Sequence, residues 1–200
     1  ALGQSMQLTL AVEGLDTSGL YRVPGTLTSQ ATVVVDRHGD RLVVPYHDSR
    51  VDKSPDWLPL ERLANADILH CDARWVEGSE AALRAAARAK VPSMIDGDVA
   101  PLYSLQRLVP LATYAVFSDA GLFIYSGCDD LESALRKVGS HHPGHVGASC
   151  GGHGYFWYED GAIHHVSAPR VDVVDTLSAG DIFHGAFALA LCEGRKTAAA

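Results

Sequence analysis

The stretch Asp175-Thr176-Leu177-Ser178-Ala179-Gly180-Asp181-Ile182-Phe183-His184-Gly185 places a loop of small residues directly before an acidic residue and an apolar run. Residues 171–174, just before it, are predicted to form a buried strand because three of the four are valine. The apolar residues that follow recur at the i, i+1, i+4, i+5, i+8 spacing of one helix face. They are Ile182, Phe183, Ala186, Phe187 and Ala190. The sequence therefore predicts a strand, a loop and a helix that begins at the loop.

A loop at a helix N-terminus is a place where backbone amides can bind an anion. The amides of Ser178, Ala179, Gly180 and Asp181 are free to converge on negative charge, and the helix dipole adds to the attraction. If the bound anion is a phosphoryl group in transfer, Asp181 is placed to take the proton of the attacking hydroxyl. We therefore expect an anion hole beside a catalytic base.

Composition and charge restrict the class of protein. The chain has 200 residues, of which 47% are hydrophobic and 20% charged, as expected for an α/β protein with a full core. Its formal net charge of −8 argues against a nucleic-acid or anionic-membrane surface. The sequence has no apolar run of membrane-spanning length and no signal-like start, so we expect a cytoplasmic protein with no membrane partner.

Strand and helix patterns alternate along most of the chain. Strands are expected at 66–72, 91–96, 113–118 and 146–149, and helices at 78–90, 102–108 and 130–138. This alternation predicts an α/β fold with a doubly wound, mostly parallel sheet flanked by helices. Two hairpins are also expected, one from strands 28–36 and 41–47 around residues 37–40, the other at 155–167 around residues 159–161.

These elements suggest three parts. Residues 1–14 are expected to form a core helix, residues 15–50 a small β lid with its connections, and residues 51–200 the α/β core. The alternating apolar residues of the lid strands leave an edge that can pair with a second copy, which predicts a homodimer through the lid.

The stretch 175–185 resembles the Asp-Thr-x-Gly-Ala-Gly-Asp signature of the ribokinase-like, or phosphofructokinase B type, carbohydrate kinases. The similarity extends to residues 13–18, 36–40, 95–98 and 149–154. Within the family, Asp72-Ala73-Arg74-Trp75 together with Asp96-Gly97-Asp98 and residues 173–185 most resembles the bacterial sulfofructose kinase branch. Relative to the family, segments at both ends are expected to be missing from this chain.

The resemblance implies an ATP-dependent sugar kinase with Asp181 as its base and Mg²⁺ as its metal. Ser149, Gly151, Gly154 and Thr176 would contact the nucleotide, since the glycine-rich turn 149–154 lets the backbone approach a phosphate. The alternative for that turn is a plain glycine hairpin. Potassium near the loop that contains Asp175 is a further implication.

Substrate contacts are expected where predicted strands end, because ligands gather at the carboxyl ends of strands in open α/β sheets. Asp72 is suited to accept sugar hydroxyl protons, and Arg74 to hold an anionic substituent; the alternative is a surface ion pair. Asp96 and Asp98 either reach the same crevice or form an Asp-Gly turn with a helix cap.

Two departures from the family pattern affect the site. Residues 118–121 replace an Asn-x-x-Glu motif that organises magnesium and phosphate, and Asp119 is left to hold a magnesium-bound water. Ser178 stands where the signature has glycine, and a positive φ at a serine would cost about 1–2 kcal/mol.

The leading hypothesis is a kinase that phosphorylates a hydroxymethyl group of a ribose-, fructose- or sulfofructose-like sugar. A nucleoside kinase on the same fold is one alternative. A non-catalytic relative that binds sugar or nucleotide is another, suggested by Ser178 and the replaced motif at 118–121.

Overall fold

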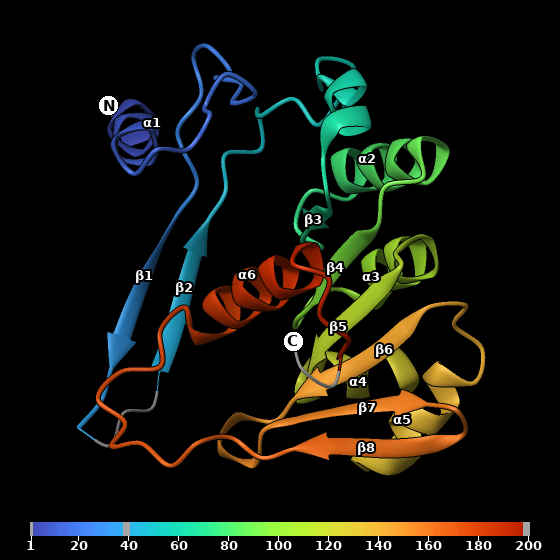
Figure 1. The fold of residues 1–200 in the computed structure, drawn as a ribbon. Coiled ribbons are helices and arrows are strands. Elements are labelled where there is room, and N and C mark those ends of the chain that lie inside the picture. The colour runs from blue at the N-terminus through green and yellow to red at the C-terminus, as the bar shows by residue number, and fades with distance from the viewer. Residues whose placement is uncertain (1, 38–40, 198–200) are drawn as a thin grey trace. The chain divides into compact units, whose positions relative to one another are not determined.

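The computed structural model describes residues 2–37 and 41–197 and divides the chain into two compact units, Ala1–Pro59 and Leu60–Ala200 (Figure 1). Each unit is described by itself.

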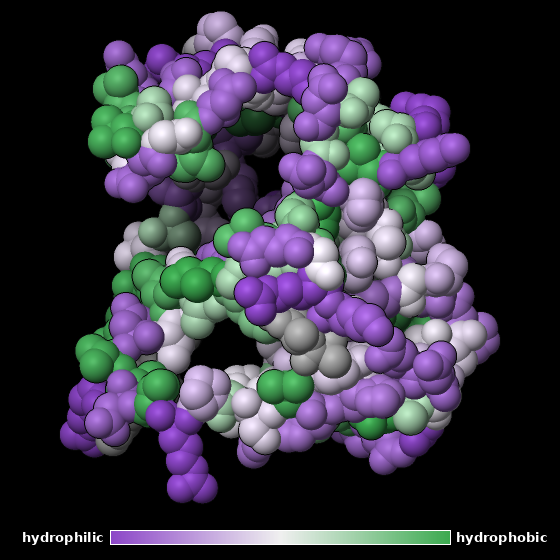
Figure 2. All heavy atoms as spheres, viewed as in Figure 1, coloured by the Kyte–Doolittle hydropathy of each residue, from purple (hydrophilic) through white to green (hydrophobic). Residues whose placement is uncertain are grey.

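The first unit contains a helix and a hairpin. Helix α1 spans Leu2–Val12 and has no buried residue. Strands β1 (Gln30–Val35) and β2 (Arg41–Tyr46) pair antiparallel, from Gln30 opposite Tyr46 to Val35 opposite Arg41. The predicted hairpin is therefore confirmed, although residues 38–40 of its expected turn lie outside the described residues. Apolar side chains remain exposed on both strands, as the green surface over the hairpin indicates (Figure 2).

The second unit has a six-stranded sheet in the order β3-β4-β5-β6-β7-β8. Strands β3 to β6 are parallel, whereas β7 and β8 form the antiparallel hairpin expected at 155–167. The elements in chain order are η1 Leu60–Asn65, β3 Leu69–Cys71, α2 Val76–Ala89, β4 Ser93–Gly97, α3 Leu102–Leu108, η2 Val109–Leu111, β5 Tyr114–Ser118, α4 Asp119–Ser126, α5 Leu131–Gly139, β6 His145–Ser149, η3 Gly151–His153, β7 Tyr155–Glu159, β8 Ala162–Val166 and α6 Ala179–Cys192.

Helices cover both faces of this sheet. Alternate residues of the central strands point to opposite faces, so Ile95 and Phe117 pack into a cluster with α2 to α5, while Met94 and Val116 pack against α6. Figure 1 shows α6 on one side of the sheet and α2 and α3 on the other. The doubly wound, mostly parallel arrangement is thus confirmed.

The strand predicted at 171–174 is wrong. These residues are extended loop, and Val171, Val173 and Val174 are exposed. Valine favours a strand only where a neighbouring edge can pair with it, and within the described residues the sheet has no place for this segment. The valine run was therefore a false signal.

The predicted face of α6 is shifted by one residue. The helix buries His184, Phe187 and Ala188 and half-buries Phe183, whereas Ile182 is 70% exposed. The helical period was predicted correctly, but the predicted face did not include His184, and it lies one position towards the N-terminus of the face that is buried. Helix α4, which covers residues interpreted only as a metal motif, was also missed.

No helix among the described residues is both long and apolar enough to cross a membrane.

Candidate active site

The loop before α6 ends in a strained serine. Ser178 precedes the first residue of the helix and has φ 59° and ψ 13°, in the left-handed region. A positive φ is the strained conformation anticipated from the sequence for a serine in the glycine position of the signature. Residue 178 therefore keeps the backbone geometry typical of glycine although it is a serine. The chain thereby turns sharply into α6 and brings Asp181 into the first helical turn.

The amides of this turn only partly match the predicted anion hole. The amide of Ala179 donates to the carbonyl of Thr176 over 3.2 Å and is thus engaged within the loop. Among the described residues, the amides of Ser178, Gly180 and Asp181 have no backbone acceptor, as expected for the first turn of a helix. Three of the four expected donors are therefore available to a ligand.

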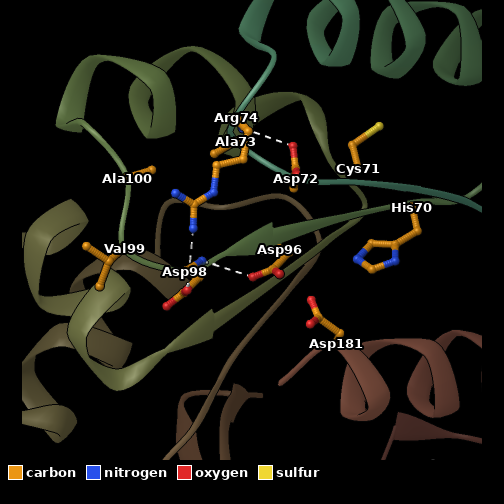
Figure 3. Close-up of a pocket in the computed structure, with 10 residues that line it drawn as sticks. All are labelled: His70, Cys71, Asp72, Ala73, Arg74, Asp96, Asp98, Val99, Ala100 and Asp181. Atoms are coloured by element: carbon orange, nitrogen blue, oxygen red, sulfur yellow. Dashed lines mark hydrogen bonds and ion pairs between the residues drawn. The ribbon is translucent and has the colours of Figure 1, made fainter. Parts of the chain in front are cut away.

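Asp181 lines a polar cavity of about 310 Å³ at the carboxyl ends of β3 and β4 (Figure 3). Asp72 and Arg74 from the segment after β3 line the same cavity, as do Asp96 and Asp98 from the end of β4. Figure 3 shows the Asp181 carboxylate projecting from α6 towards the region of Asp96 and His70. The structure therefore brings together Asp181, the predicted base, and both residues predicted to bind the substrate.

Short contacts fix the wall of this cavity. The Arg74 amide donates to Oδ1 of Asp72 over 2.9 Å, and the Asp98 amide donates to Oδ1 of Asp96 over 3.0 Å. The Arg74 guanidinium lies 4.0 Å from Oδ2 of Asp98, and both side chains are more than half exposed. Asp96 and Asp98 thus form a turn and also reach the crevice. The helix cap that the alternative interpretation included is not present, because α3 begins after Pro101 without a side-chain cap.

Two histidines add to the electrostatics of the site. His70 on β3 lines the cavity, and its ring stacks on that of His184 with centroids 5.5 Å apart. Burial lowers the pKa of His70, and His184 lowers it further, against the opposing charges of Asp96, Asp72 and Asp181. Burial also raises the pKa of Asp96, although His184 opposes that shift. The carboxylate-rich cavity is therefore backed by two stacked imidazoles, of which His184 is buried and His70 is exposed.

A second, more apolar cavity of about 370 Å³ lies at the other side of the first turn of α6. Its lining includes Ser149, Gly151 and Gly154 from the glycine-rich turn, together with Ala179 and Gly180. Gly154 has φ 95°, and a Cβ there would lie 2.0 Å from the carbonyl oxygen of Val166. Only glycine fits that position, so the turn is shaped by close backbone packing as well as by an open surface.

Four predicted residues line neither cavity, and one of them is Ser178. Thr176 and Asp175 are in the exposed loop before α6, where Asp175 accepts the amide of Leu177 over 2.8 Å. Asp119 is exposed in the first turn of α4. The described residues contain no cluster of three or more side chains arranged to hold a metal.

The presence of glycine at position 121, where the Asn-x-x-Glu motif has glutamate, has a steric explanation. A Cβ on Gly121 would lie 1.8 Å from the carbonyl oxygen of Gly97, so α4 packs directly on the end of β4. A glutamate of the Asn-x-x-Glu type cannot fit there. Ser118 instead caps α4 by accepting the Gly121 amide over 3.0 Å.

The sequence interpretation gave His70 and His184 no role. His184 is 2% exposed, and His70 belongs to a strand of only three residues. His184 follows Asp181 by three residues, so both side chains lie on nearby faces of the predicted helix. This spacing was the feature of the sequence that could have identified His184 as part of the site.

A doubly wound sheet with a helix N-terminus between two cavities defines a ribokinase-like α/β protein. Residues 1–200 match the pfkB family carbohydrate kinase, and the chain belongs to this family, whose members are phosphotransferases.

Solved structures show the same fold. A putative ribokinase from Agrobacterium tumefaciens is 35% identical, with a TM-score of 0.91 over 97% of this chain and 64% of that chain. A putative ribokinase II from E. coli in complex with ATP and Mg²⁺ is 20% identical, with a TM-score of 0.81 over 97% of this chain and 67% of that chain. An adenosine kinase from Sinorhizobium meliloti is 16% identical, with a TM-score of 0.82 over 98% of this chain and 64% of that chain. This chain thus spans about two thirds of the length of each.

Proposed function

We propose that the protein transfers the γ-phosphate of ATP to a hydroxymethyl group of a sugar, with Asp181 as general base. The observation that carries the proposal is the position of the first turn of α6, which presents Asp181 to the polar cavity and Gly180 to the apolar one. A group transferred between ligands in the two cavities passes this helix N-terminus, where amides and dipole stabilise negative charge.

We assign ATP to the apolar cavity on the basis of its lining. Gly151, where a Cβ would meet nothing within 4 Å, leaves backbone open to a phosphate chain beside Ser149 and Gly154. Apolar atoms from Phe183 and Pro169 suit a ribose or base. The E. coli ribokinase II structure with ATP and Mg²⁺ shares the fold and supports this assignment. Thr176, in the loop before α6, is proposed as a further nucleotide contact.

Magnesium needs few protein ligands when phosphates and waters supply the others. The lack of a ready-made cluster of three ligands among the described residues fits such an ion, and Asp119 is the carboxylate that we propose to hold one of its waters. Bound there, the ion would neutralise phosphate charge. A potassium ion beside Asp175 remains a proposal, with one carboxylate oxygen already engaged by Leu177.

The polar cavity favours a neutral sugar over a sulfonated or phosphorylated one. Four carboxylates line it, at Asp72, Asp96, Asp98 and Asp181, against the single guanidinium of Arg74. Carboxylates accept hydroxyl protons well but repel an anionic substituent. A ribose- or fructose-like acceptor is therefore proposed ahead of a sulfofructose-like one.

In the proposed step, the hydroxymethyl oxygen attacks the γ-phosphorus as Asp181 takes the hydroxyl proton. The bond from the γ-phosphorus to the bridging oxygen breaks, and ADP leaves with that electron pair. The amides of Ser178 and Gly180, which have no backbone acceptor among the described residues, would stabilise the charge that develops on the transferred group. Most of the rate gain would come from positioning and charge stabilisation.

The lining of the polar cavity gives less support to the alternative of a nucleoside kinase. Its lining, within the described part of the chain, contains no Phe, Tyr or Trp side chain on which a base could stack. The similarity to an adenosine kinase is at 16% identity and concerns the fold. A non-catalytic relative remains the alternative if no sugar is phosphorylated.

Two further proposals concern partners and location. The exposed Val34, Val43 and Val44 of the hairpin suit pairing with a second copy, which analytical ultracentrifugation of the hairpin variant Val43→Lys would test. The requirement for ATP supports the cytoplasmic location expected from the sequence.

The deciding experiment is a coupled ADP-release assay on the intact protein, with Mg²⁺, K⁺ and neutral, phosphorylated and sulfonated sugars. Asp181→Asn should lower kcat by about 10²–10⁴-fold, because general base catalysis contributes that much. Its nucleotide-dependent thermal stabilisation should persist. Asp129→Asn, an exposed carboxylate outside both cavities, is the matched control. Full activity in Asp181→Asn would remove the proposed base; no turnover with any sugar would favour the non-catalytic relative.

A further inference from the structure

His184 is a buried polar residue on α6, one turn after Asp181, and its contacts join three parts of the site. Its Nδ1 lies 2.8 Å from the carbonyl oxygen of Gly180. Its Nε2 lies 3.3 Å from the carbonyl oxygen of Val116 on β5 and 3.6 Å from Oδ1 of Asp96 on β4. The ring therefore contacts the first turn of α6, the middle of β5 and the carboxyl end of β4.

All three partners of this ring are hydrogen-bond acceptors. A neutral imidazole has one N–H, so one of its nitrogens would face a carbonyl oxygen with a lone pair. The doubly protonated ring donates from both nitrogens and places its charge beside the Asp96 carboxylate, which compensates for burial. The contacts thus favour a ring that donates on both sides.

The two ends of this arrangement belong to the two cavities. Asp96 lines the polar cavity, and Gly180 lines the apolar one and immediately precedes Asp181. His70 stacks on His184 with an interplanar angle of 16° and separates it from the polar cavity that His70 lines. A shift of the ring would therefore move the helix turn relative to the strand ends.

We propose that His184 is a positioning residue that donates from both ring nitrogens and holds Asp181 in register with Asp96. The inference rests on the proposed function for its kinetic consequence, but not for the protonation of the ring. His184 would act through Asp181 and Asp96 and would touch neither the sugar nor ATP in the proposed reaction.

The kinetic test compares His184→Phe, which keeps a ring but no donor, with His184→Gln, which keeps one donor, in the intact protein. His184→Phe should lower kcat by about 10²-fold, because misplacement of about 1 Å can cost that much, while KM for ATP stays within about threefold. His184→Gln should recover about tenfold of that loss through its remaining donor. His142→Gln is the matched control, because His142 also bonds a backbone carbonyl, Val109 at 3.1 Å, outside both cavities.

Wild-type kcat in His184→Phe, or equal losses in His184→Gln and His142→Gln, would overturn the positioning role. If His184→Phe does not fold, the comparison of the two glutamine variants decides.

A spectroscopic test separates this inference from the proposed function. In ¹H–¹⁵N spectra of the intact wild-type protein, His184 should give two protected ring N–H signals that disappear in His184→Gln. Asp96→Asn should shift the Nε2 signal and leave the Nδ1 signal in place. A single N–H signal would overturn the inference even in an active kinase; two signals in a protein that phosphorylates no sugar would retain the buried arrangement and reject the kinase.

Discussion

The hydroxyl of Ser118 donates a hydrogen bond of 2.8 Å to Oδ1 of Asp98, which joins the N-terminus of α4 to the wall of the polar cavity. The same oxygen accepts the amide of Gly121 over 3.0 Å. One side chain therefore caps a helix and restrains a carboxylate of the proposed sugar site.

Ser118→Ala should remove both interactions at once. The loss of the cap should lower the free energy of unfolding by about 1 kcal/mol, within the usual range for such caps. The released Asp98 should raise KM for the sugar more than KM for ATP. Urea unfolding and steady-state kinetics measure the two effects, with Ser118→Thr as the control that keeps the hydroxyl. A lower stability with unchanged KM for the sugar would confine Ser118 to capping.

Gly121 should tolerate no side chain. Gly121→Ala places a Cβ on the carbonyl oxygen of Gly97, and the backbone of β4 must move to admit it. We expect a loss of about 1–3 kcal/mol in unfolding free energy, as for other overpacked sites. Gly152→Ala is the control, since its Cβ would meet nothing within 4 Å. Equal stability of the two variants in urea titrations would contradict the packing argument.

Much of the site was predictable because it obeys a rule of the fold. Asp72 ends a predicted strand and Arg74 follows it, and the carboxyl ends of parallel strands meet at one edge. Asp181 could be predicted as the base because a loop of small residues precedes it. The structure placed all three around one cavity.

What the sequence did not reveal depends on tertiary partners. His184 is buried because carbonyls from β5 and α6 and the carboxylate of Asp96 surround it, and none of these lies in its own sequence pattern. Residues 171–174 have the composition of a strand but no paired edge among the described residues. The amide of Ala179 was counted as free because the turn back to Thr176 cannot be read from residue types.

Ser178 offers a test of backbone strain. Its φ of 59° suits glycine, so a glycine at this position would relieve the backbone strain. The greater conformational freedom of glycine in the unfolded chain would offset part of that gain in stability. Ser178→Gly should therefore raise the free energy of unfolding by about 0.5–1 kcal/mol, while Ser178→Val should lower it by about 1–2 kcal/mol. Denaturant titration of both variants gives the values. A less stable glycine variant would show that the serine side chain outweighs the strain.

The stability of the second unit should depend on pH through His145, which begins β6. Its Nε2 lies 2.7 Å from the hydroxyl of Tyr155, and burial is the main cause that lowers its pKa from 6.5 to about 4. His142 lowers this pKa further, and Glu159 opposes the shift. The unfolded chain thus binds a proton at His145 before the folded protein does. The contribution to stability is complete above pH 6.5 and is lost as the pH falls towards 4.

That shift corresponds to about 3 kcal/mol of unfolding free energy between pH 7 and pH 4. Carboxylates titrate in the same range, so the measurement is the difference between the wild type and His145→Gln, which can still bond the Tyr155 hydroxyl but does not titrate. Urea unfolding at half-unit pH steps should show the wild type losing stability faster than the variant below pH 6.5. Parallel curves for the two proteins would mean that His145 takes up its proton in the folded state as easily as in the unfolded chain, and that another group sets the acid sensitivity.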